Sequence, residues 1–202
     1  MLNDFLTRRS FVKLGFAASA VAMTAPAALA LTTGEATALV DRVVADINKV
    51  ISSGKPLGGM INDFEKILIR YGDVPIIARS ALGADARSLS GSQMSSYTKA
   101  FQGYLARKYG KRFNEFVGGT IEVQDARQVK SFYEVRTLVK LKGEAPFAVN
   151  FLVSDKSGKN LFFDIIIEGV SIRLSEKTEI GAMLDRRGGN VDQMIADLKQ
   201  AG

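Results

Sequence analysis

The apolar residues of this chain change their spacing once, after Gly118-Gly119, and this change limits the possible folds more than any other feature. Before it, apolar residues recur every three or four positions, which is typical of amphipathic helices. After it, they alternate with polar residues, which is typical of half-buried strands. Helices and strands in separate halves of one chain favour an α+β fold with an antiparallel sheet.

The first half predicts four helices, over residues 37–51, 60–68, 73–83 and from Ser90 onward. Asp73 and Pro75 have the places of a cap and a first-turn proline. Ser90 and Gln93 have the spacing of a capping box. In the last and longest helix, large side chains follow one face for more than twenty residues: Met94, Tyr97, Phe101, Leu105, Tyr109, Phe113 and Phe116. Such a stripe needs a broad apolar surface opposite it.

The second half predicts four antiparallel strands, over residues 121–123, 133–141, 147–153 and 161–172. Each alternates so that one face of the sheet is apolar and the other polar. In the last strand, alternation places Phe163, Ile165 and Ile167 on the apolar face and Asp164 and Glu168 on the opposite one. Gly169 predicts a bulge or a bend. Two short helices, around residues 180–184 and 191–198, close the chain.

The first thirty residues have the order of features found in a twin-arginine signal peptide. Arg8-Arg9 and Lys13 precede a weakly apolar run over residues 14–23, and a small-x-small cleavage pattern follows at residues 28–30. The run is shorter than the about 20 apolar residues that span a bilayer. We therefore expect residues 1–30 to be removed on export, and residues 31–202 to form one periplasmic domain.

The chain contains neither cysteine nor histidine. This composition excludes disulfides, thiolate nucleophiles and Ser-His-Asp triads, and with them most zinc sites. Carboxylate or lysine chemistry stays open. The formal net charge of +6 is mildly basic, but no dense Lys/Arg block indicates a nucleic-acid partner. We expect no metal, no cofactor and no nucleic acid.

Residues 161–171 carry the most informative motif, an Asp-x-x-x-Glu-Gly-Val-Ser pattern that runs from Asp164 to Ser171. This segment resembles the matching strand of the MlaC-type phospholipid carriers, also called the toluene-tolerance auxiliary family. Further resemblance lies in the Leu-Gly that ends residues 77–83, in the spacing of Gln93, Tyr97, Phe101, Leu105 and Tyr109, and in the Val-x-Thr of residues 135–137. The chain departs from the family in two segments. Family members often have aromatic residues directly after the Leu-Gly, where this chain has Ala-Asp-Ala at residues 84–86. They often have a Tyr-Arg pair after the Val-Ser strand, where this chain has Arg-Leu-Ser-Glu-Lys at residues 173–177.

The resemblance implies a curved four-stranded antiparallel sheet wrapped by helices around an apolar lipid cavity. It implies a periplasmic carrier of phospholipid, which is its cargo, between an outer-membrane lipoprotein complex and an inner-membrane ABC transporter with a lipid-binding ring subunit. Such transport maintains outer-membrane lipid asymmetry, and it needs no catalytic residue. The expected lipid-binding residues lie on the apolar strand face and on the long helix: Phe101, Leu105, Tyr109, Val135, Thr137, Val139, Val149, Phe151, Phe163, Ile165 and Ile167.

Two other functions fit the same elements. A cone-shaped α+β enzyme would place Asp164 or Glu168 in an apolar cavity, where burial raises a carboxyl pKa and suits it to act as a general base. A structural protein of the cell envelope would instead have a filled core. A deep cavity with a carboxylate at its base would favour the enzyme, and a core without a continuous cavity would favour the structural protein.

Overall fold

The computed structural model describes residues 31–202. The predicted signal peptide, residues 1–30, lies outside the described residues. Six α-helices are present in the described part: α1 (Thr33–Ile51), α2 (Leu57–Tyr71), α3 (Val74–Leu82), α4 (Gly91–Gly110), α5 (Ile172–Arg186) and α6 (Val191–Leu198). Two 3-10 helices follow α3 and α4, η1 (Gly83–Arg87) and η2 (Lys111–Phe116).

One antiparallel sheet lies between η2 and α5 in the chain, in the strand order β1-β2-β3-β4-β5. The strands are β1 (Thr120–Val129), β2 (Phe132–Lys140), β3 (Phe147–Ser154), β4 (Leu161–Ile167) and β5 (Val170–Ser171). The α+β class and the antiparallel pairing are therefore confirmed. The expected number of four strands is wrong, because a short fifth strand pairs with the edge of β4.

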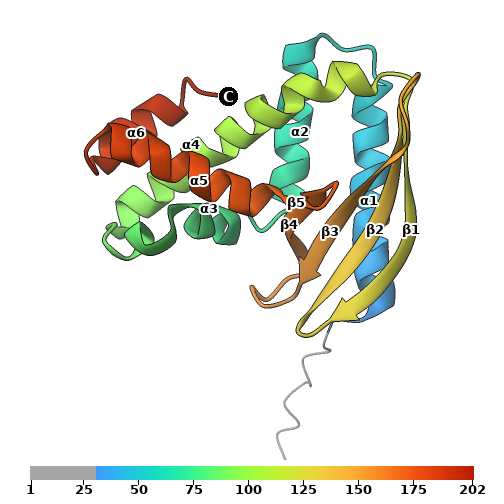
Figure 1. Cartoon of the computed structure of the whole chain (residues 1–202), viewed down its shortest axis with the longest axis horizontal. Coiled ribbons are helices and arrows are strands. Elements are labelled where there is room, and N and C mark those ends of the chain that lie inside the picture. Colours follow the sequence, from blue (N-terminus) through green and yellow to red (C-terminus); the bar gives the residue numbers. More distant parts are fainter. Residues whose placement is uncertain (1–30) are drawn as a thin grey trace, which may run out of the picture.

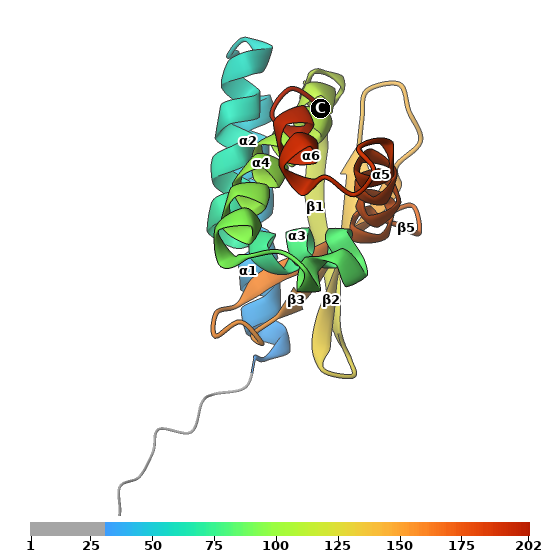
Figure 2. The ribbon, with the colours of Figure 1, turned by 90° about the vertical axis from the view of Figure 1, so that its left-hand side faces the viewer.

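The sheet has an inner face, which carries Val135, Val139 and Phe151, and an outer face, which carries Arg136 and Lys140. Helix α1 packs against β1, β2 and β3, and α2 packs against α1 and α4. Helices α3 to α6 form a second group beyond the β4 end of the sheet (Figures 1 and 2).

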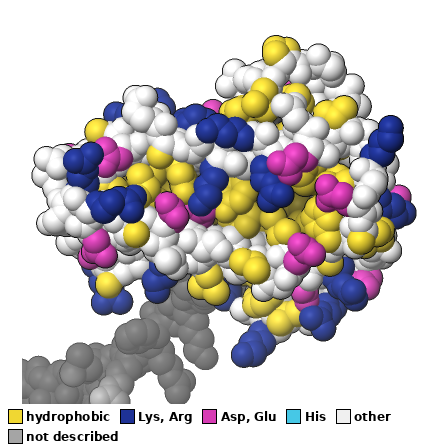
Figure 3. All heavy atoms as spheres, turned by 45° about the horizontal axis from the view of Figure 1, so that its top comes forward, with side chains coloured by type: hydrophobic (Ala, Val, Ile, Leu, Met, Phe, Trp, Pro, Cys, Tyr) yellow, Lys and Arg dark blue, Asp and Glu magenta, His cyan; other side chains and the backbone are white. Residues whose placement is uncertain are grey.

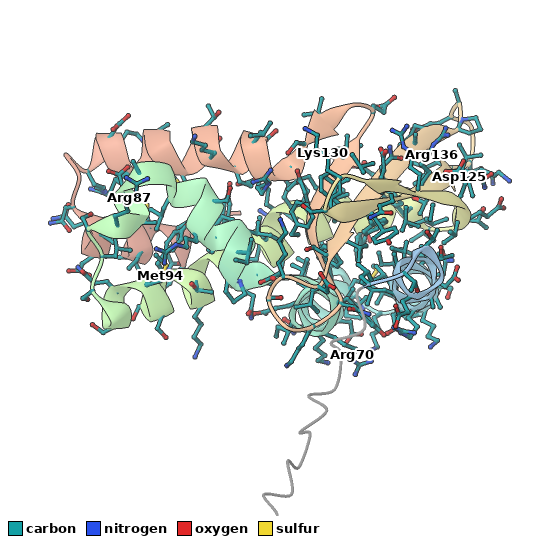
Figure 4. All side chains as sticks on the ribbon, turned by 90° about the horizontal axis from the view of Figure 1, so that it is seen from below. Arg70, Arg87, Met94, Asp125, Lys130 and Arg136 are labelled. Atoms are coloured by element: carbon teal, nitrogen blue, oxygen red, sulfur yellow. The ribbon has the colours of Figure 1, made fainter. Side chains whose placement is uncertain are left out.

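Figure 4 shows both ends of the molecule from below. Arg136 and Asp125 lie together on the sheet, where their side chains form an ion pair at 3.3 Å, whereas Arg87 and Met94 lie in the helical group at the opposite end.

Local side-chain chemistry sets the helix starts as predicted. Ser90 and Gln93 form a reciprocal capping box at α4, and the Asp73 carboxylate accepts a hydrogen bond from the backbone N–H of Ile76 at the start of α3. Helix α4 ends at Gly110, and the apolar stripe continues into η2 through Phe113 and Phe116. The aromatic stripe is thus divided between two elements, and the change of direction turns its last rings toward the sheet.

The predicted last strand, residues 161–172, is wrong in its second half. Glu168 and Gly169 have positive φ angles of 49° and 84°, and they form a two-residue turn that pairs Ile167 with Val170. Such a turn suits a tight hairpin. Ser171 then caps α5, because its Oγ accepts a hydrogen bond from the backbone N–H of Leu174.

An irregularity in β4 also changes which aromatic ring faces inward. Leu152 pairs with Asp164, but the next residue, Val153, pairs with Phe162, so that Phe163 is the extra residue of a β-bulge. Phe162 is consequently buried on the inner face with only 2% of its surface exposed. The prediction that Phe163 shares a face with Ile165 and Ile167 is wrong for this reason.

Candidate binding pocket

An apolar pocket with a volume of about 380 Å³ lies between the inner face of the sheet and helices α1, α2 and α4. Its deep walls are made by buried side chains, among them Leu68, Ile77 and Phe162. Its mouth is made by exposed residues of η2, of the loop between β2 and β3, and of the Glu168-Gly169 turn. Figure 3 shows apolar side chains gathered toward the sheet end of the molecule, with basic and acidic side chains beside them.

Four phenylalanines form a continuous wall of the pocket. The ring centroids of Phe64 and Phe113 are 4.7 Å apart, those of Phe113 and Phe116 are 6.2 Å apart, and those of Phe116 and Phe147 are 6.4 Å apart. All three pairs meet edge to face, and this geometry stabilises the pairs beyond the free energy gained by burying the rings. The wall connects α2 through η2 to β3, and it gives the pocket a broad apolar surface.

Seven of the expected lipid-binding residues line this pocket: Leu105, Tyr109, Val139, Val149, Phe151, Ile165 and Ile167. Four do not: Phe101, Val135, Thr137 and Phe163. Phe101 is one turn before Leu105 and packs on the rings of Tyr97 and Tyr104, at centroid distances of 5.6 and 6.1 Å. Val135 and Thr137 are buried on the inner face, and the Thr137 hydroxyl donates to the carbonyl oxygen of Val149.

Phe163 lies away from the pocket because of the bulge in β4. Its ring packs edge to face on Phe132 at 5.5 Å, and the Arg173 guanidinium lies over it at 5.8 Å.

Sequence reasoning missed the lining residues of the first two helices, Ile47, Phe64 and Leu68. Their spacing marks them as helix core, and no local pattern separates a core position that faces a pocket from one that faces another side chain. Phe113, Phe116 and Phe147 were visible as apolar positions in the stripe and in the third strand, so their pattern could have placed them with the pocket.

Asp164, the first residue of the motif, is buried beneath the first turn of α5. One of its oxygens accepts hydrogen bonds from the backbone N–H groups of Ile165 and Arg173, at 2.9 and 3.0 Å. The other accepts from the Ser171 hydroxyl at 2.6 Å and lies 3.6 Å from Nε of Arg173. This carboxylate therefore connects β4 to α5, and its acceptor positions are occupied.

Glu168 reaches the pocket only at its mouth, where it is exposed to solvent. Asp164, in contrast, is a buried lining residue of the pocket, as the enzyme alternative requires, but its carboxylate is engaged by the Ser171 hydroxyl and by the backbone N–H groups of Ile165 and Arg173. These hydrogen bonds favour a structural role for Asp164 over the role of a general base.

A polar cluster adjoins the pocket where α4 and α5 approach each other. Tyr109 lines the pocket, and its hydroxyl donates to Oε1 of Glu176 at 2.6 Å. The Lys108 ammonium donates to the same oxygen at 2.8 Å and to the Tyr104 hydroxyl at 2.9 Å. Burial raises the pKa of Tyr104 to about 12 and also raises the pKa of Tyr97 and Tyr109.

Within residues 31–202, no group of three or more His, Cys, Asp or Glu side chains is placed to hold a metal ion. In the same range, no helix has the length and apolar character needed to cross a membrane.

The chain matches known proteins in sequence and in fold. Residues 37–200 match the family described as MlaC protein. A solved phospholipid-binding protein from Ralstonia solanacearum, in complex with a phospholipid, has a similar fold with a TM-score of 0.66. The two chains are 22% identical in sequence, and the match covers 81% of this chain and 98% of the Ralstonia chain. Since the family match extends over most of the sequence, this chain belongs to the MlaC protein family.

Proposed function

We propose that this chain is a periplasmic phospholipid carrier, and that acyl chains occupy the pocket beneath the sheet. The observation that carries the proposal is the pocket itself: an apolar interior walled by four phenylalanines, and a mouth at which charged side chains meet solvent. A phospholipid has the same division between apolar chains and a charged head group. The Ralstonia protein, which shares the fold, was solved with a phospholipid bound.

Hydrophobic burial is strong enough to hold such a cargo against water. Each buried CH₂ group contributes about 0.8 kcal/mol, so that ten of them contribute about 8 kcal/mol. That free energy corresponds to a Kd of about 1 μM before the cost of ordering the lipid is subtracted. The volume of about 380 Å³ is near the lower end of the range of about 300–1,000 Å³ for ligand pockets. We therefore expect the pocket to widen when two acyl chains enter.

The proposal places the chain between two membranes. It would receive phospholipid from one membrane and deliver it to the other, through an outer-membrane lipoprotein complex and an inner-membrane ABC transporter with a lipid-binding ring subunit. Transfer between a pocket and a bilayer is nearly balanced in free energy, because both offer an apolar environment to the acyl chains. Net direction would then come from the transporter, and the outcome would be outer-membrane lipid asymmetry.

Lipid extraction from the purified residues 31–202, followed by mass spectrometry, tests the proposal. We expect co-purified phospholipid, and we expect delipidated protein to take up phospholipid from vesicles. Protein that neither carries nor takes up phospholipid would contradict the carrier function.

A matched pair of variants locates the lipid. Val149 lines the pocket on the inner face, whereas its neighbour Ala148 is exposed on the outer face. Val149→Phe should reduce the amount of bound phospholipid, because the added ring fills the pocket. Ala148→Phe adds at least as much bulk to the same strand and should leave the bound lipid unchanged. Equal lipid content in both variants would place the lipid elsewhere.

A further inference from the structure

Glu176 is a carboxylate in an unusual place. It lies in the second turn of α5 with none of its surface exposed to solvent. Acidic side chains are rarely buried completely unless they are paired. It is also the one fully buried side chain between Ile172 and Glu179, the first half of α5. In this half of the helix the fully buried side chain is therefore a charged one and not an apolar one.

The contacts of Glu176 all lead to α4. Its Oε1 accepts from Nζ of Lys108 at 2.8 Å and from the hydroxyl of Tyr109 at 2.6 Å. Lys108 also donates to the Tyr104 hydroxyl, so that two side chains of α4 bond directly to one carboxylate oxygen and a third is linked to it through Lys108. Oε2 is buried and has no hydrogen-bond partner among the described residues.

The main packing of the two helices is elsewhere. Helix α4 packs on α2, α3 and α6, whereas α5 packs mainly on α3. Long side chains thus bridge α4 and α5, and Glu176 is the residue on which they converge.

The cluster lies directly behind a wall of the pocket. Ile172 and Arg173 line the pocket from the start of α5, and Glu176 follows them by four and three positions, on the same face of the helix. Tyr109 lines the pocket from α4, and its hydroxyl bonds to Glu176. The Tyr109 ring in the wall is therefore held by an acceptor that is not itself part of the pocket lining.

We infer that Glu176 is a positioning residue for lipid retention: its carboxylate holds the Tyr109 ring in the pocket wall and ties α5 to α4 behind that wall. This inference rests on the proposed carrier function. With the bridge in place, the wall between the two helices stays closed around bound acyl chains. Without it, α5 loses its connection to α4 and the pocket opens more readily.

Release of lipid to vesicles tests this role. Each protein is loaded with a phospholipid that has a fluorescent acyl chain, and release to excess phosphatidylcholine vesicles is followed by fluorescence. Tyr109→Phe keeps the ring but removes the hydroxyl, and Glu176→Leu removes the acceptor. We expect both to release lipid about tenfold faster than the wild type, the factor expected when a hydrogen bond to a charged group is lost. Glu176→Gln keeps an oxygen acceptor for Tyr109 and should restore most of the retention.

Glu134→Gln is the control. Glu134 is also a buried carboxylate, and it accepts hydrogen bonds from Arg127 at 2.7 Å and Asn150 at 2.8 Å, away from the pocket lining. The Glu134→Gln variant should release lipid at the wild-type rate even if its thermal stability is lower. The inference is wrong if Tyr109→Phe, folded by circular dichroism, releases lipid at the wild-type rate, or if Glu134→Gln accelerates release equally. A wild-type protein that takes up no phospholipid would overturn the carrier function itself, before any variant is compared.

Discussion

Asp164 shows how a single motif residue can be structural while also lining the candidate pocket. Its carboxylate accepts hydrogen bonds from both ends of the β4–α5 connection, and only 4% of the residue is exposed. The Asp-x-x-x-Glu-Gly-Val-Ser pattern therefore describes a strand, a tight turn and a helix cap. Asp164 fixes the direction in which α5 leaves the sheet, and α5 in turn supplies Ile172 and Arg173 to the pocket.

Removing this carboxylate should be costly. Asp164→Ala is expected to lower the free energy of unfolding by about 3 kcal/mol, because it leaves buried donors and Arg173 without their partner. Urea unfolding followed by circular dichroism measures the change. Asp125→Ala is a suitable control, since its ion pair with Arg136 is more than half exposed on both sides. Exposed pairs of this kind contribute about 0–1 kcal/mol, and equal losses in both variants would contradict the structural role of Asp164.

The buried tyrosines predict a loss of stability in alkali. Burial raises the pKa of Tyr104 to about 12, whereas the unfolded chain ionises near the ordinary value of about 10. Tyr104 therefore keeps its proton to a higher pH in the folded state than in the unfolded chain. Its contribution to the free energy of unfolding is complete below about pH 10 and is lost as the pH rises toward about 12. The midpoint of urea unfolding should fall over this interval, and Tyr104→Phe should reduce the fall. A midpoint that stays constant from pH 10 to 12 would contradict this expectation.

The bulge in β4 decides which of two adjacent phenylalanines contributes to the pocket. Strict alternation from Ile165 and Ile167 selects Phe163, but one extra residue reverses the assignment and places Phe162 inside. Phe162 also forms part of the core, with its ring 5.6 Å from that of Phe151. Alternation cannot reveal a bulge, because the bulge depends on how β4 pairs with β3 and not on the composition of β4 alone.

Two alanine substitutions should separate these neighbours. Phe162→Ala should lower the free energy of unfolding by about 4 kcal/mol, because it removes a fully buried ring and leaves a cavity. Phe163→Ala removes a half-buried ring outside the pocket and should cost about 1 kcal/mol. Urea unfolding measures both values. If the larger loss belonged to Phe163→Ala, the register of β4 described above would be incorrect.

The helices were predictable where an apolar stripe or a capping residue marked them, as at Ser90 and Asp73. The start of α5 was not, because its first half has no apolar stripe and is attached through Asp164 and Glu176. Polar attachment of this kind involves partners distant in sequence. β5 escaped prediction for a related reason, since a two-residue strand is defined by its pairing with β4 and not by its composition.

The pocket is a property of several elements together. Helix α2, η2 and β3 contribute to the aromatic wall, whereas η2, the loop between β2 and β3 and the Glu168-Gly169 turn form the mouth. Seven of eleven expected residues were found in its lining because the inner face of the sheet and one face of α4 follow simple periods. The contributions of α1 and α2 depend on how far those helices stand from the sheet, which no local pattern encodes.

The predicted export route of the whole chain can be tested at its arginine pair. Replacing Arg8-Arg9 by two lysines preserves the charge but removes the guanidinium pair on which the twin-arginine route depends. We expect the variant to accumulate unprocessed in the cytoplasm, as measured by cell fractionation and immunoblotting. A periplasmic protein of the general secretion route, followed in the same cells, serves as the control. Undiminished export of the variant would show that the arginine pair is incidental, while the periplasmic destination would still stand.

The order of the strands has a kinetic consequence. Every neighbour within the sheet is also the next strand along the chain, and the loops at Lys130-Ser131 and Glu168-Gly169 have only two residues. Closing short loops costs little chain entropy, and proteins rich in local contacts fold faster than those that must join distant segments. We expect the sheet to assemble rapidly, one hairpin after another. Rapid assembly would suit the predicted twin-arginine export, which carries folded proteins, because the pocket would then be complete before the chain crosses the membrane.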